Sequence, residues 1–84
     1  MTLKEMLDLR IIRDNVQIRE FIPSADGLGT LKILCDVVRS YSIVEEKTLL
    51  DKGLNAKYLN YDIIEMWGTS NKYKLGIVIR SPKR

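Results

Sequence analysis

Residues 15–38 read NVQIREFIPSADGLGTLKILCDVV, and this stretch decides the fold. Apolar and polar side chains alternate over 15–22, as they do in a half-buried strand. The next seven residues hold Asp26-Gly27, a dipeptide typical of hairpin turns. Residues 30–38 then form a second apolar-rich run. The stretch therefore predicts a β-hairpin.

The two faces of the returning strand differ in their apolar content. A strict alternation places four apolar residues on one face: Leu31, Ile33, Cys35 and Val37. The other face is half apolar: Lys32, Leu34, Asp36 and Val38. The sequence leaves open whether this second face is covered by the chain's own helices or by a partner.

Two capping-box patterns flank the hairpin. Thr2 with Glu5 predicts a helix that ends between Leu9 and Arg13. Ser42 with Glu45 predicts a second helix over 43–52, which Gly53 would stop. Both helices have apolar residues at helical spacing and so have a face to bury.

A second hairpin follows the second helix. Residues 62–67 and 72–80 read as strands joined by a turn at 68–71, and Gly76 indicates a bulge or a close backbone approach. The order α-β-β-α-β-β predicts an α+β fold. We expect one domain over 1–84, with an antiparallel four-stranded sheet, helix on one face and a short basic tail at 81–84. The order of the strands in the sheet is not predicted.

Length and composition limit the functions to consider. The 84 residues leave no room for a dinucleotide-binding domain, a kinase or a barrel enzyme. Hydrophobic residues make up 45%, which is too apolar for a disordered chain. The core of such a short chain is small, and a partner would add stability. A homodimer therefore stays open.

Cysteine and histidine content argues against catalysis and metal binding. The chain has one cysteine and no histidine, which excludes a structural zinc site and the commonest general base. We expect a protein that is not an enzyme and has no cofactor. The single cysteine, the charged N-terminal segment and the lack of a long apolar run predict a cytoplasmic protein with no membrane partner.

Positive charge gathers at the C-terminal end. The last thirteen residues carry five basic and no acidic side chains, whereas the other 71 carry nine basic and eleven acidic ones. Cations with nearby aromatics on a strand are typical of a binding surface for nucleic acid or an acidic protein. The candidate binding residues are Trp67, Lys72, Tyr73, Lys74 and Arg80. The alternative is an edge strand that outward lysines protect from aggregation.

Both ends of the chain resemble a known group of proteins. The opening Thr2-Leu3-Lys4-Glu5-Met6-Leu7, the strand beginning Val16-Gln17-Ile18 and the closing Leu75-Gly76-Ile77-Val78-Ile79 carry the resemblance. The chain is similar to small prophage and mobile-element proteins of Firmicutes with a TLKE-type N-terminus. The resemblance implies an accessory protein of a bacterial host's mobile element that interferes with a host system, as anti-CRISPR and other anti-defence proteins do.

These observations lead to one functional hypothesis and three alternatives. We expect a non-enzymatic binding protein that inhibits a host defence protein or nucleoprotein complex by steric occupation. The first alternative is a small nucleic-acid-binding regulator that uses the basic C-terminal strand. The second is an oligomeric sponge for a nucleotide signal, and the third is a dimerisation module without a ligand.

Overall fold

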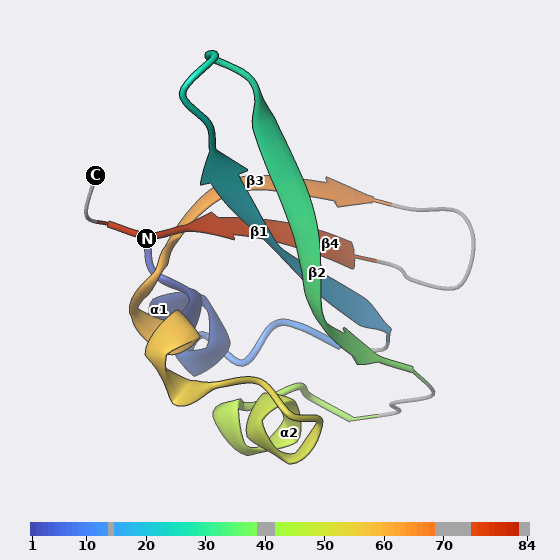
Figure 1. Ribbon diagram of the computed structural model, residues 1–84. Coiled ribbons are helices and arrows are strands. Elements are labelled where there is room, and N and C mark those ends of the chain that lie inside the picture. Colours follow the sequence, from blue (N-terminus) through green and yellow to red (C-terminus); the bar gives the residue numbers. More distant parts are fainter. Residues whose placement is uncertain (14, 39–41, 69–74, 83–84) are drawn as a thin grey trace.

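The computed structural model describes residues 1–13, 15–38, 42–68 and 75–82 (Figure 1). Its helices and strands follow the expected order, and a short 3-10 helix, η1, precedes the third strand. The elements are α1 (Leu3–Asp8), β1 (Val16–Pro23), β2 (Gly29–Val37), α2 (Glu46–Asp51), η1 (Ala56–Asn60), β3 (Asp62–Gly68) and β4 (Leu75–Arg80). The expected start of the last strand, 72–74, lies outside the described residues.

Helix α1 begins as the capping box predicts. The Thr2 hydroxyl accepts a hydrogen bond from the Glu5 backbone N–H at 3.1 Å, and the Glu5 carboxylate accepts one from the Thr2 N–H at 2.8 Å. These bonds satisfy two donors that a helix start would leave unpaired. The helix ends at Asp8, and Arg10 takes a left-handed φ of 56° just after it.

The sheet is mixed, with the strand order β2-β1-β4-β3. Each hairpin is antiparallel internally, but β1 and β4 pair in parallel, from Val16 opposite Leu75 to Glu20 opposite Ile79. The expected all-antiparallel sheet is therefore wrong. A hairpin fixes only the pairing of its own two strands. The pairing between the two hairpins joins β1 and β4, the two most buried strands. Parallel strands need a long connection, and the segment with α2 and η1 is part of it.

The two helices and η1 lie on one side of the sheet (Figure 1). Buried residues from α1, α2 and η1 pack against Ile18 of β1 and against Ile77 and Ile79 of β4. Ile77 and Ile79 have no exposed surface. One face of the sheet thus forms the core, as expected, and no helix of the described residues lies over its opposite face.

Helix α2 starts later than the sequence predicts. Its N-cap is Glu45, and the Thr48 hydroxyl accepts a hydrogen bond from the Glu45 N–H at 3.1 Å. The expected box with Ser42 and a start at residue 43 are therefore wrong. Val44 is fully buried, and its N–H bonds to the Ile12 carbonyl at 2.8 Å. The contact between Val44 and Ile12 keeps this segment extended, although the local sequence pattern favours a helix there.

A bulge in β2 changes which side chains face the core. Ile18 pairs with Cys35, but the next residue, Arg19, pairs with Ile33, so that Leu34 is an extra residue. Cys35 and Val37 are buried in the core, whereas Leu31 and Ile33 are 48% and 54% exposed. The prediction that these four apolar residues share one face is therefore wrong.

Within the described ranges, no helix has both the length and the apolar character needed to cross a lipid bilayer.

Candidate functional site

The face of the sheet that none of the described helices covers is the candidate site, and we call it the open face. Residues paired across strands share a face, so the register gives its members. They are Gly29, Leu31, Ile33 and Asp36 of β2; Gln17, Arg19 and Phe21 of β1; Gly76, Val78 and Arg80 of β4; and Asp62, Glu65 and Trp67 of β3. The face thus combines aromatic, aliphatic and charged groups.

Trp67 lies over Gly76. The two residues are cross-strand partners, and a Cβ atom at position 76 would overlap the indole ring. Glycine is therefore the residue that lets the ring lie flat on the backbone of β4. The guanidinium of Arg19 lies over the Trp67 ring, 4.9 Å from the ring centroid. Such a cation-π contact contributes about 0.5–2 kcal/mol.

Phe21 repeats this arrangement on the neighbouring strands. Its ring occupies the space where a Cβ of Gly29 would project, and the guanidinium of Arg80 lies 5.6 Å from the ring centroid. Val78 lies on the same face and is only 2% exposed, although it does not belong to the helix-covered core cluster. The side chains of the open face themselves shield Val78 from water.

A hydrogen-bond relay holds Arg19 in place. The Arg19 Nε–H donates to the Gln17 side-chain oxygen at 2.7 Å, and the Gln17 amide donates to the Asp36 carboxylate at 3.0 Å. Gln17 is only 6% exposed, which makes it the one buried polar side chain among the described residues. A buried amide with both ends bonded keeps a fixed orientation. The terminal nitrogens of Arg19 are not part of this relay.

Leu31 and Ile33 form the aliphatic edge of the open face. Both lie on β2 beside Phe21 and Arg19, respectively, and about half of each side chain is exposed. The tip of this hairpin projects beyond the rest of the sheet (Figure 1). Two exposed aliphatic residues on one face, one of them next to the Phe21 ring, give the kind of apolar surface that a partner covers.

The described part of the open face carries two cations and three carboxylates, so it is not basic. Arg19 and Arg80 lie towards the middle of the sheet, and Asp36, Asp62 and Glu65 lie on its two outer strands. Arg80 and Asp62 also line a hollow of about 290 Å³ at the end of β4, together with Ile64, Ser81 and Pro82. Within the described part of the face, carboxylates thus surround two guanidinium groups.

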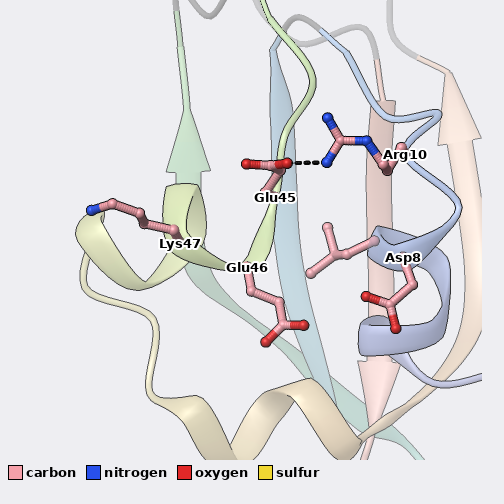
Figure 2. Close-up of a pocket in the computed structure, with 6 residues that line it drawn as sticks. Asp8, Arg10, Glu45, Glu46 and Lys47 are labelled. Carbon is pink, nitrogen blue, oxygen red and sulfur yellow. Dashed lines mark hydrogen bonds and ion pairs between the residues drawn. The ribbon is translucent and has the colours of Figure 1, made fainter.

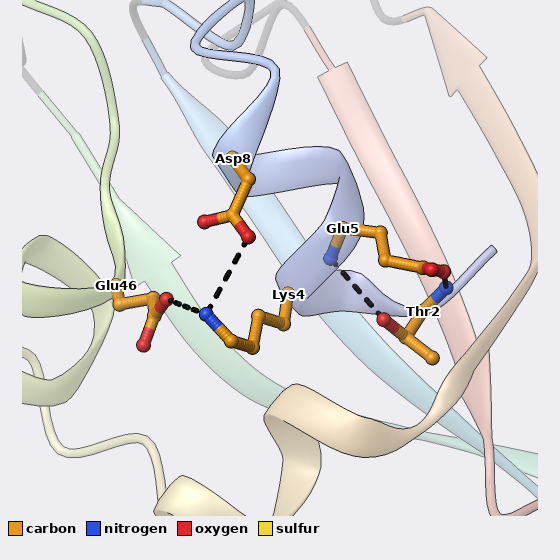
Figure 3. A network of polar contacts seen from close by, with 5 residues as sticks. All are labelled: Thr2, Lys4, Glu5, Asp8 and Glu46. Carbon is orange, nitrogen blue, oxygen red and sulfur yellow. Dashed lines mark hydrogen bonds and ion pairs between the residues drawn. The ribbon is translucent and has the colours of Figure 1, made fainter.

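A second hollow, of about 250 Å³, lies between α1 and α2 on the other side of the molecule (Figure 2). Arg10 pairs with Glu45 at its rim. Lys4 lies 2.9 Å from Glu46 and 3.4 Å from Asp8 (Figure 3). The hydrogen bond to Glu46 and the charge of Asp8 raise the pKa of Lys4. These cations and carboxylates neutralise each other, so we interpret the cluster as a set of ion pairs that holds α1 against α2.

The structure describes two of the five binding residues predicted from the sequence. Trp67 and Arg80 both lie on the open face, at opposite ends of the row Gly76, Val78 and Arg80 on β4. The other three, Lys72, Tyr73 and Lys74, lie outside the described residues. The cation that contacts Trp67 is Arg19, which is not among the five predicted residues.

Sequence reasoning did not select Arg19, Phe21 and Gln17. They share a face of β1 by simple alternation, and a glycine stands opposite Trp67 in the second hairpin. The alternation of Gln17, Arg19 and Phe21 was the available signal. It could not indicate which strand would lie next to β1, and only that neighbour brings Trp67 and Arg80 to these residues.

No group of three or more histidine, cysteine, aspartate or glutamate side chains among the described residues is arranged to hold a metal ion. Comparison with protein families, with curated proteins and with solved structures gives no match for this chain.

Proposed function

We propose that this chain is a non-enzymatic binding protein whose open face docks on another protein and blocks it by occupation. One observation carries the proposal: a sheet face that no helix of the described residues covers presents Phe21 beside the exposed Leu31, with Ile33 next along β2 and Trp67 on the far strand, β3. Aromatic residues and arginine are enriched in protein interfaces and contribute most of their binding energy. The rings are already fixed over glycines, so little side-chain entropy is lost on docking.

The two outer strands support docking on the face rather than at an edge. Both β2 and β3 carry a bulge, at 33–35 and at 63–65. Lys32 is exposed on β2, and the backbone of Met1 and Thr2 pairs with the start of β3. Bulges, lysines and covering segments are the usual means by which proteins prevent strand addition at an edge.

A host defence protein is the target class that we propose, because the two ends of the chain resemble mobile-element proteins. Such a target needs only to be covered at a functional surface, and this requires no catalytic group. A small sheet with a preformed aromatic face is suited to this steric mode of action.

A nucleic-acid target is the second candidate, because aromatic rings on an open sheet face can stack on bases. Two observations favour a protein instead. A guanidinium lies over each of the Trp67 and Phe21 rings and would have to move before a base could stack there, whereas a protein can pack against the rings and the arginines as they stand. Asp36, Asp62 and Glu65 on the outer strands would also repel a phosphate backbone.

Affinity capture from nuclease-treated bacterial lysate tests the proposed function. The bait is the wild-type chain, and the test variant carries Leu31→Ser and Ile33→Ser. The matched control carries Leu9→Ser and Ile11→Ser, which replace two aliphatic residues exposed near α1, 52% and 63%. We expect a protein that the wild type and the control capture and the test variant loses. Equal capture by all three, or loss of every partner after nuclease treatment, would contradict the proposal.

A further inference from the structure

We propose that Arg19 and Arg80 are receptors for carboxylates, so that the open face takes an acidic and apolar segment of its partner. This inference rests on the proposed function and specifies the chemistry of the partner. It follows from the state of the two guanidinium groups. Both lie near aromatic rings on an exposed face, and no carboxylate in the described ranges forms an ion pair with either.

The relay beneath Arg19 shows why its charge is left uncompensated. Asp36 is the carboxylate at that end of the face, but it accepts a hydrogen bond from the Gln17 amide, and Gln17 in turn accepts one from Arg19. A neutral amide thus separates the carboxylate from the guanidinium. Only Nε of Arg19 is used by the relay, and the terminal nitrogens can form the two parallel bonds of a bidentate carboxylate contact.

Arg80 offers a second receptor on the neighbouring strand. Arg19 stands opposite Val78, and Arg80 is two residues further along β4. Strand geometry places the Cα atoms of two such positions roughly 8 Å apart, from about 4.8 Å between strands and 6.6 Å along one strand. The guanidinium of Arg19 reaches from β1 to Trp67 of β3, and that of Arg80 reaches from β4 to Phe21 of β1. One extended segment of a partner that crosses β1 and β4 can therefore contact both arginines.

The surroundings of the two arginines select a protein segment over a polyanion. Ile33 lies beside Arg19, and Leu31 lies beside Phe21, the ring that Arg80 contacts; both aliphatic residues need an apolar partner, which a phosphate backbone does not supply. The carboxylates on the outer strands would repel a polyanion that runs across the whole face. They leave room for a ligand whose few negative charges lie over the two central strands. An acidic segment with apolar side chains satisfies both conditions.

Selection from a random peptide library on the immobilised chain tests this inference. The selected peptides are then titrated against the free protein, with the fluorescence of Trp67, the only tryptophan, as the signal. The variants are Arg19→Ala, Arg80→Ala and Arg19→Lys, which keeps the charge but loses the planar fork. The control is Lys32→Ala, which removes a cation from the same hairpin on its other face. Thermal unfolding verifies that each variant is folded.

We expect selected peptides with paired Asp or Glu residues beside apolar ones. Each arginine variant should weaken their binding by about tenfold or more, and Lys32→Ala should leave it unchanged. Substituting Gln and Asn for the carboxylates of the peptide should have the effect of Arg19→Ala.

Three results would overturn the inference. The selected peptides could lack acidic residues, and only the Leu31→Ser and Ile33→Ser variant could fail to bind them. This result would contradict the carboxylate receptor but would agree with the proposed docking face. The absence of any peptide that distinguishes this variant from the wild type would contradict both proposals. Salt-sensitive binding of an oligothymidine strand that Arg19→Ala abolishes would assign the arginines to nucleic acid.

Discussion

The indole ring of Trp67 lies directly on the backbone of Gly76, in the space that a side chain at position 76 would fill. This contact joins β3 to β4 and places the ring under Arg19. The open face is therefore built from the backbone upward: glycine, aromatic ring and guanidinium. The same sequence of groups recurs at Gly29, Phe21 and Arg80.

Gly76→Ala should destabilise the protein by about 1–3 kcal/mol, because the new methyl group must displace the ring. Without this contact, alanine in a strand would stabilise the fold by about 0.4–1 kcal/mol. The sign of the change therefore tests the contact. Urea unfolding followed by Trp67 fluorescence measures it. Gly68→Ala is the matched control, because nothing lies within 4 Å of a Cβ at position 68. A neutral or stabilising Gly76→Ala would show that the ring lies elsewhere.

Because of the bulge at Leu34, two isoleucines of the first hairpin should contribute very different amounts to the stability of the fold. Ile18 is 1% exposed and Ile33 is 54% exposed. Ile18→Ala should cost about 2–5 kcal/mol, because it leaves a cavity in the core. Ile33→Ala should cost about 0.5 kcal/mol or less. Equal losses in chemical denaturation would mean that Ile33 faces the core and that the bulge is absent.

Cys35 should be unreactive in the folded protein. It is 4% exposed, its thiol points to the Leu49 carbonyl, and burial together with the charge of Asp36 raises its pKa. At neutral pH it is therefore protonated and shielded, and both conditions slow its reaction as a nucleophile. Alkylation by iodoacetamide, followed by mass spectrometry, should be slow in buffer and fast in concentrated urea. A similar rate in both would place the thiol at the surface.

The capping box of α1 makes stability depend on acid pH. The backbone hydrogen bond from Thr2 is the main cause that lowers the pKa of Glu5 below its ordinary value of 4.5. A carboxyl with a lowered folded-state pKa contributes its stability above 4.5 and loses it as the pH falls through the lower, folded-state pKa. Wild type should therefore lose more stability than Glu5→Gln on acidification.

Melting temperatures of both proteins over a pH series measure this difference. Glutamine can also close a capping box, so the variant should fold normally at neutral pH. Parallel curves for the two proteins would contradict the assigned role of Glu5.

The local features of the fold could be predicted from the sequence, whereas the assembly of the sheet could not. The first hairpin, the Thr2 capping box and the stop at Gly53, which has a φ of 98°, depend on neighbouring residues. The parallel pairing of β1 with β4 depends on contacts between residues nearly sixty positions apart, such as Val16 and Leu75. No local pattern encodes such a pairing.

The bulge at Leu34 explains the main error about the site. Strict alternation predicts Leu31 and Ile33 on one face with Cys35, but one extra residue in β2 puts them on the opposite face. Trp67 and Arg80 were predicted as binding residues because aromatic and cationic side chains favour interfaces. Arg19 was not predicted, because its contact with Trp67 crosses β4 and exists only once the sheet order is known.

The central claim is that a protein partner covers the open face, and methyl NMR of the complex tests it most directly. The chain is labelled at leucine and isoleucine methyl groups and titrated with the protein captured from lysate. We predict that the signals of Leu31 and Ile33 shift on binding, whereas those of Leu9 and Ile11, equally exposed near α1, stay in place. Shifts confined to Leu9 and Ile11 would contradict the account and place the binding surface on the helical side.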